Sequence, residues 1–226
     1  MQGRKPVTAI LFDMDNTLFD FVAAQIHSCH QVAHFLEQED GHALYTYFQR
    51  PIHGYEAHEN IRDYMNDRGF FSDGTYERAR RIYEEEKLRN ISPYPGVHDT
   101  LREILKRGLP MGIVTDAYSR EATLRLEKSG LLPFFSGIVS CDLSGAKKPA
   151  PEPFLAALKM FRTDPAHVLL IGDSPRRDIE PCRDLGIRTV YARYGDCFSH
   201  DRSSVRADFT IDAMGELLTI LCSLTG

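Results

Sequence analysis

The chain has 226 residues, of which 42% are hydrophobic and 26% are charged, with 27 lysines and arginines against 32 aspartates and glutamates. This is the composition of a globular protein that can bury a core, which excludes a disordered chain and a disulfide-stabilised miniprotein. The net charge of −5 argues against a broad binding surface for nucleic acid or an anionic membrane, and leaves room only for local basic pockets.

Cysteine usage and the first residues indicate the compartment. The five cysteines are scattered and form no Cys-x-x-Cys pair, so the sequence predicts free thiols rather than a disulfide framework or a zinc knuckle. Free thiols fit a reducing cytoplasm. The first residues, MQGRKP, lack the apolar region of a secretory signal, and no apolar stretch approaches the roughly 20 residues of a membrane span. We therefore expect a cytoplasmic protein.

The N-terminal part of the chain contains a strand and then a run of helices. The apolar run VTAILF at 7–12 ends at Asp13 and predicts a buried parallel strand. The residues from 21 to 91 show no convincing strand, and their patterns predict helices at 22–38, 42–50, 57–67 and 74–89. We interpret residues 21–91 as a helical domain inserted into a domain formed by residues 1–20 and 92–226.

The α/β pattern resumes after the turn SPYPG at 92–96. Three further strands are predicted, at 111–114, 167–171 and 188–191. Between and around them the periodicity predicts helices, several of which end at a glycine, at 97–106, 119–128, 153–161 and 181–185. Alternating strands and helices of this kind predict a doubly wound, Rossmann-like α/β fold with a parallel sheet.

Polar residues suited to phosphoryl chemistry follow three of the predicted strands. They are Asp13-x-Asp15-x-Thr17 after the first strand, Thr115-Asp116 after the second, and Gly172-Asp173-Ser174 after the third, with Lys148 and Asp178 on either side of the last group. In open α/β sheets, ligands bind outside the carboxyl ends of the strands. We therefore expect these side chains to converge on one site.

The sequence resembles the haloacid dehalogenase-like (HAD) superfamily. Its four ordered motifs match Asp13-x-Asp15-x-Thr17, Thr115, Lys148-Pro149 and Gly172-Asp173-Ser174-x3-Asp178. The helical insertion falls where that family has its C1 cap, so the resemblance covers almost the whole chain. Within that superfamily, the sequence resembles the C1-cap phosphatases of the phosphoglycolate phosphatase-like type.

The resemblance implies a catalytic role for four side chains. Asp13 would be the nucleophile that forms an aspartyl-phosphate. Asp15 would protonate the leaving oxygen and then activate water as a general acid and base. Thr115 would donate a hydrogen bond to a phosphoryl oxygen, and Lys148 would offset the clustered negative charge.

The resemblance also implies Mg²⁺ as cofactor, a hard cation that prefers oxygen ligands. Asp13 and Asp173 would contribute carboxylate oxygens and Asp15 its backbone carbonyl. Asp178 would orient metal-bound water or Lys148. One position departs from a common form of the pattern, because Asp116 stands where many relatives have asparagine. Its backbone N–H could still bind the phosphate, so the change puts the role of its side chain in question.

Alternative reactions can be weighed against individual residues. Dehalogenases have a non-carboxylate residue at the position of Asp15, so an aspartate there favours phosphoryl transfer. Phosphonoacetaldehyde hydrolases need a lysine in the cap that forms a Schiff base with the aldehyde. Lys87 is the only lysine between residues 21 and 91, and its place near the far end of the last predicted cap helix argues against that reaction. A phosphomutase of the β-phosphoglucomutase type shares the core motifs and stays open. So does a non-catalytic binding module on the same fold.

The cap is expected to select the substrate. Arg50 and His53 lie in a glycine-containing loop and are predicted to contact the leaving group of the substrate. An equally good interpretation is that this loop is only a solvated turn between two helices. His27, His30 and His34 share a helix face that is read as a polar stripe rather than as a metal site. The expected partner is a small phosphorylated metabolite, such as phosphoglycolate, a sugar or triose phosphate, or a nucleoside 5′-monophosphate. No residue pattern sets the oligomeric state.

Overall fold

The computed structural model describes residues 5–199 and 201–225. The chain divides into two compact units, one made of Met1–Asp20 and Pro93–Gly226 and the other of Phe21–Ser92. Within the ranges described, no helix is both long enough and apolar enough to cross a membrane. The assignment of the second unit as a C1-type cap stays a prediction.

The first unit is built on one parallel sheet of six strands in the order β3-β2-β1-β4-β5-β6. The strands are β1 Ala9–Phe12, β2 Met111–Val114, β3 Gly137–Val139, β4 Val168–Gly172, β5 Arg188–Ala192 and β6 Phe209–Ile211. Phe12 at the end of β1 pairs with Ile113 of β2 and Ile171 of β4, so the three central strands end at nearly the same level. The predicted parallel α/β sheet is confirmed.

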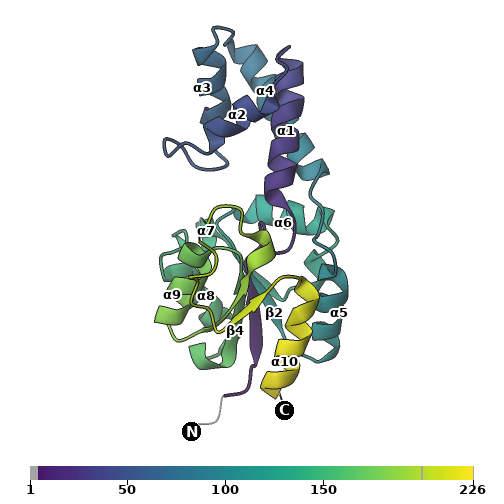
Figure 1. The fold of residues 1–226 in the computed structure, drawn as a ribbon, viewed down its shortest axis with the longest axis vertical. Coiled ribbons are helices and arrows are strands. Elements are labelled where there is room, and N and C mark those ends of the chain that lie inside the picture. The colour runs from purple at the N-terminus through teal and green to yellow at the C-terminus, as the bar shows by residue number, and fades with distance from the viewer. Residues whose placement is uncertain (1–4, 200, 226) are drawn as a thin grey trace. The chain divides into compact units, whose positions relative to one another are not determined.

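Helices cover both faces of this sheet (Figure 1). The longer ones are α5 Val97–Lys106, α6 Ser119–Lys128, α8 Glu152–Phe161 and α10 Leu217–Thr225, and the shorter ones are α7 Cys141–Ser144 and α9 Glu180–Asp184. Phe154 and Ala157 of α8 and Cys182 of α9 pack with Leu11 and Leu170 of the central strands in one buried cluster. Figure 1 shows α5 and α10 together on the other side of the sheet. Burial on both faces explains why the central strands are apolar throughout.

Single turns of other helix types complete the first unit. Those of the 3-10 type are Leu132–Phe134, Pro165–His167, Arg193–Gly195 and Met214–Glu216, and Pro175–Ile179 forms one π-helical turn. The segments Pro175–Ile179 and Arg193–Gly195 follow β4 and β5 directly, so both lie at the carboxyl end of the sheet.

The second unit consists of four helices, α1 Phe21–Phe35, α2 Gly41–Phe48, α3 Glu59–Asp67 and α4 Asp73–Arg89. Side chains cap two of them, because Asp40 accepts a hydrogen bond from the His42 N–H and Ser72 accepts one from the Thr75 N–H. The unit has its own apolar core, which includes Val32, Leu44, Phe48, Tyr64 and Tyr83. The helix ends match the predicted ranges to within three residues.

The structure differs from the sequence-based expectation at the edges of the sheet. The two edge strands, β3 and β6, were not predicted, and neither were α7 and α10. Each edge strand has only three residues and carries partly exposed positions, so neither forms the continuous apolar run that marks a buried strand. The omission affects no residue of the predicted site.

Candidate active site

Asp13 is the first residue after β1, and it is almost completely buried. Its N–H donates to the carbonyl of Ile171, which continues the sheet pairing by one step and fixes the backbone at this position. The hydroxyl of Thr17 lies 3.4 Å from Asp13 Oδ2 and 3.4 Å from Asp173 Oδ1. The short turn from 13 to 17 therefore holds its own aspartate and also reaches the end of β4.

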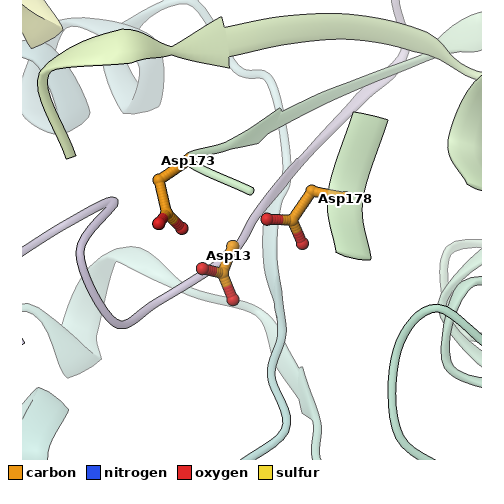
Figure 2. A group of neighbouring side chains, drawn as sticks. All are labelled: Asp13, Asp173 and Asp178. Carbon is orange, nitrogen blue, oxygen red and sulfur yellow. The ribbon is translucent and has the colours of Figure 1, made fainter. Parts of the chain in front are cut away.

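Asp173 follows β4, and Asp178 belongs to the π-helical turn Pro175–Ile179. Asp178 accepts a hydrogen bond from the Ser174 N–H at Oδ2 over 3.0 Å. A side chain at Gly172 would overlap the Asp178 carboxyl group, so this approach requires glycine. Figure 2 shows the carboxyl groups of Asp13, Asp173 and Asp178 gathered around one point. Each offers an oxygen within 4.8 Å of the other two.

Lys148 is the cation at the centre of this cluster. Its Nζ donates to Asp13 Oδ1 at 2.5 Å and to Asp178 Oδ1 at 2.6 Å, and its side chain is buried. The peptide bond between Lys148 and Pro149 is cis. The neighbouring Lys147 is exposed. The structure thus brings together the lysine that the motif selects with two of the predicted aspartates.

The three carboxyl groups differ in their pKa values because their neighbours differ. Burial opposes the ionised form of Asp13, but the charges of Lys148 and Arg177 hold the pKa of Asp13 below 3.8. Burial together with Asp13 and Asp178 raises the pKa of Asp173 well above 3.8. For Asp178, burial and Asp13 outweigh Lys148 and raise the pKa to about 6. The cluster therefore has more acidic groups than its cations neutralise, and Asp13 is the one best held as a carboxylate.

Thr115 and Asp116 follow β2 at the same edge of the sheet. Thr115 is buried, and its hydroxyl accepts a hydrogen bond from the Ala117 N–H over 3.1 Å. Asp116 Oδ1 accepts from the Lys148 N–H over 2.8 Å, and Oδ2 lies 3.5 Å from Arg177 Nη1. The carboxylate that replaces the common asparagine thus holds the Lys148 backbone and faces an arginine that offsets its charge.

Asp15 forms a long-range ion pair. Its Oδ2 accepts from Arg125 Nη1 over 2.8 Å, and the Arg125 side chain is only 3% exposed. Arg125 lies in α6, three residues after the buried Ala122. Sequence reasoning missed both Arg125 and Arg177. The sequence does carry a signal for Arg125. It stands three residues after Ala122 and therefore on the apolar face of the predicted helix, where a charged side chain needs a buried partner.

Arg50 and His53 share one acceptor in the second unit. Asp63 Oδ2 lies 2.7 Å from Arg50 Nη2 and 3.1 Å from His53 Nε2. The Arg50 guanidinium also stacks over the Tyr47 ring, 3.9 Å from its centroid. The structure therefore places the two predicted cap residues together, on a carboxylate that fixes the loop between α2 and α3.

The helical histidines have other neighbours. The His30 ring packs against the His42 ring with centroids 5.0 Å apart, and His27 Nε2 lies 3.6 Å from Glu86. In the described ranges, the one group of three or more histidine, cysteine or acidic side chains with metal-site spacing is Asp13, Asp173 and Asp178. The predicted reading of the histidines as a polar stripe agrees with these contacts.

The acidic cluster fits a hard divalent cation. Its donors are carboxylate oxygens, which Mg²⁺ prefers over nitrogen or sulfur. Burial is the main cause of the raised pKa values of Asp173 and Asp178, and the neighbouring carboxylates raise them further, two effects that a bound cation would offset. Lys148 binds Asp13 Oδ1 and Asp178 Oδ1, and the Ser174 N–H binds Asp178 Oδ2, which leaves Asp173 and the second oxygen of Asp13 as the carboxylate atoms bound by neither of these donors.

Comparisons with known proteins agree with this geometry. The family model of the haloacid dehalogenase-like hydrolases matches residues 10–192. Pyrophosphatase PpaX of Bacillus velezensis is 28% identical over 226 residues, covering 96% of this chain and 97% of the relative. N-acetylmuramic acid 6-phosphate phosphatase of Pseudomonas aeruginosa is 31% identical over 234 residues, covering 96% of each chain. The magnesium-bound structure of YfnB from Bacillus subtilis shares the fold, with a TM-score of 0.77, 22% identity, and coverage of 96% of this chain and 100% of that one.

Proposed function

This chain belongs to the haloacid dehalogenase-like hydrolases and is a phosphoric monoester hydrolase, and we propose that it works through a phosphoryl group carried on Asp13. One observation carries the proposal. Asp13 is a buried carboxylate at the end of a central strand, ion-paired to Lys148 and adjacent to two further carboxyl groups. A carboxylate can attack a phosphate dianion when nearby positive charge offsets their repulsion.

In the first step, a carboxylate oxygen of Asp13 attacks phosphorus and the bond from phosphorus to the ester oxygen breaks. Asp15 donates a proton to that leaving oxygen, so the alcohol departs neutral. Lys148 and Arg177 keep Asp13 ionised before the attack, which their effect on its pKa supports. Thr115 is proposed to donate its hydroxyl hydrogen to a phosphoryl oxygen, because that hydroxyl uses only an acceptor site in its bond to the Ala117 N–H. The N–H of Asp116 is proposed as a further donor.

In the second step, Asp15 acts as the base. It takes a proton from water as the water oxygen attacks phosphorus, and the bond between phosphorus and Asp13 breaks. Asp13 is then a carboxylate again, and Asp15 is protonated for the next cycle. The ion pair with Arg125 supports this role, since it fixes the Asp15 side chain in one orientation.

We propose that Asp13, Asp173 and the Asp15 carbonyl hold Mg²⁺, with Asp178 acting through Lys148 or a bound water. When bound, Mg²⁺ supplies positive charge that offsets the carboxylates and the substrate phosphate. The excess of acidic groups over cations in the cluster supports the site. Asp178 is held by Lys148 and by the Ser174 N–H, which supports a positioning role for it.

The substrate is proposed to be a small phosphorylated metabolite. Relatives that cover nearly the whole chain are named for pyrophosphate and for N-acetylmuramic acid 6-phosphate. A relative in Pyrococcus furiosus, 34% identical over 62% of this chain and 58% of its own length, is named for glyceraldehyde 3-phosphate. These compounds join the sugar phosphates, triose phosphates, phosphoglycolate and nucleoside monophosphates as candidates. A cytoplasmic location is proposed on the free cysteines.

Arg50 and His53 stay as the proposed contacts with the leaving group. Both side chains bind Asp63, which supports the proposal because it holds them side by side in the loop before a substrate binds. For Arg50→Ala we expect a raised KM for the best substrate, with little change in kcat. An unchanged KM would remove Arg50 from the substrate site and leave it as a structural partner of Asp63.

A phosphate-release screen over these metabolites tests the function, with Mg²⁺ present and then removed by chelation. We expect Mg²⁺-dependent release from at least one compound, and Asp13→Asn is expected to lower it by at least about 10⁴-fold while leaving the circular dichroism spectrum unchanged. No release from any compound with Mg²⁺ would contradict the proposal and favour a binding module. Conversion of a sugar phosphate to its isomer without phosphate release would favour a phosphomutase.

A further inference from the structure

The turn after β1 has an unusual backbone, which is held by hydrogen bonds within the turn and also by a segment from elsewhere in the chain. Asn16 has a φ of +61°, in the left-handed region that few residues other than glycine adopt. Within the turn, the Asn16 N–H donates to the Phe19 carbonyl, and the Leu18 N–H donates to the Met14 carbonyl. The turn carries Asp13, Asp15 and Thr17, so its shape decides where these groups point.

A segment from the far end of the chain packs against this turn. Tyr194, in the 3-10 turn after β5, donates its hydroxyl hydrogen to the Thr17 carbonyl over 2.7 Å. The Tyr194 ring lies edge-on to the Tyr94 ring, with centroids 5.0 Å apart. The Tyr94 N–H in turn donates to the Leu18 carbonyl over 3.0 Å. Two tyrosines thus bind two successive carbonyls on the C-terminal side of the turn.

Gly195 meets the same turn by direct backbone contact. A Cβ at this position would overlap the Asn16 carbonyl oxygen and would press on the Asp173 side chain. The requirement for glycine here is one of space, because the contact is with backbone that cannot rotate away. Gly195 therefore lies against the left-handed Asn16 and also beside Asp173, the residue that follows β4.

We propose that Tyr194 and Gly195 are positioning residues that hold the Asp13–Thr17 turn in the shape needed for metal binding and phosphoryl transfer. The inference rests on the function proposed above. Tyr194 fixes the Thr17 carbonyl, and through it the Thr17 hydroxyl between Asp13 and Asp173. Gly195 lets the segment Arg193–Gly195 come close enough to the turn for the Tyr194 hydroxyl to reach it.

Tyr194→Phe tests this directly, and Tyr83→Phe, which removes a buried hydroxyl from the other unit, is its matched control. Tyr83 is a buried tyrosine of α4 in the helical unit, and its hydroxyl accepts a hydrogen bond from Gln25 Nε2 over 2.8 Å. For Tyr194→Phe we expect faster hydrogen–deuterium exchange in residues 13–19 of the metal-free protein. We also expect a dissociation constant for Mg²⁺ about tenfold higher, and a kcat about tenfold lower with KM within about threefold, since residues that orient metal ligands typically have effects of this size. Tyr83→Phe is expected to change none of these.

Equal behaviour of the two variants in exchange and in Mg²⁺ affinity would overturn the inference. Gly195→Ala is expected to lower kcat further, by about 10²-fold, with a circular dichroism spectrum like that of the wild type. If it fails to fold, Tyr194→Phe carries the test alone. The exchange measurement needs no turnover and therefore tests the positioning role even in an inactive protein. A wild-type protein without phosphatase activity would contradict the proposed function only.

Discussion

Each unit of the protein contains a lysine buried between two carboxylates, but the acidic groups around the two lysines differ in burial and in number. In the helical unit, Lys87 Nζ lies 2.9 Å from Glu84 and 3.2 Å from Glu56. In the α/β unit, Lys148 Nζ lies 2.5 Å from Asp13 and 2.6 Å from Asp178. Both lysine side chains are at most 4% exposed. The local arrangement is therefore almost the same.

The carboxyl groups around the two lysines are what differ. Glu84 and Glu56 keep 40% and 32% of their side chains in contact with solvent. Burial opposes the charge on Glu84, but hydrogen bonds from His58 and Lys87 lower its pKa to about 2. In the α/β unit the carboxylates are buried, and Asp173 adds a third one whose pKa is raised. The partners of Lys87 are partly hydrated, whereas Lys148 lies among buried acidic groups, and this surplus of buried acid is the feature on which the proposed cation site rests.

The largest expected difference between the clusters is in catalysis. Lys148→Met is expected to lower kcat/KM by about 10³-fold, because a preorganised cation next to the transferring phosphate is lost. Lys87→Met removes the same group from the other cluster and is expected to keep kcat/KM within about threefold while lowering the melting temperature. Steady-state kinetics with the best substrate and thermal unfolding measure both effects. Equal losses of activity would contradict the distinction.

A second difference is expected in the response to Mg²⁺. At a concentration of about 100 times its dissociation constant, a ligand stabilises the folded state by about 2.7 kcal/mol, or about 5–10 °C for a chain of this size. We expect the wild type and Glu84→Gln to show this rise in melting temperature, and Asp173→Asn to show little of it. If Asp173→Asn responds like the wild type, Asp173 is not a metal ligand.

The smallest expected difference is in the pH dependence of stability. The folded-state pKa of Glu84 lies below its ordinary value of 4.5, so Glu84 contributes stability above pH 4.5 that is lost as the pH falls towards 2. The pKa of Asp178 is raised from 3.8 to about 6, so the metal-free protein loses stability as the pH rises through that window.

Urea unfolding of two variants separates these contributions. For Glu84→Gln, the free energy of unfolding relative to the wild type is expected to fall as the pH rises from 2 to 4.5. For Asp178→Asn without metal, the same difference is expected to rise between pH 3.8 and 6. Differences of the same sign in the two variants would show that the clusters do not differ as described.

The sequence predicted the parts of the fold that depend on local pattern. Helices α5 and α6 and strand β2 lie at the predicted residues, because an apolar face or a short apolar run is complete within each. The four motifs also indicated which residues would meet at the carboxyl ends of the strands. Strand β6 was not predictable in this way, since three residues at a sheet edge carry almost no pattern.

The partners of the motif residues depend on tertiary structure. Arg125 pairs with Asp15 across 110 positions, and Tyr194 reaches Thr17 across 177. Neither pair has a spacing that a single sequence can reveal. The role of Asp116 likewise depends on tertiary structure. Its negative charge is explained by two neighbours that are distant in sequence, Arg177 and the Lys148 N–H.

Trapping the phosphoryl group is the most direct test of the central claim, that Asp13 carries it. The protein is mixed with its best substrate and Mg²⁺, quenched during turnover, and treated with borohydride, which reduces an acyl phosphate to an alcohol. We predict homoserine at position 13 in the mass spectrum of the digested protein, and its absence from Asp13→Asn. Turnover of substrate with an unmodified Asp13, or with homoserine formed at another aspartate instead, would contradict the account.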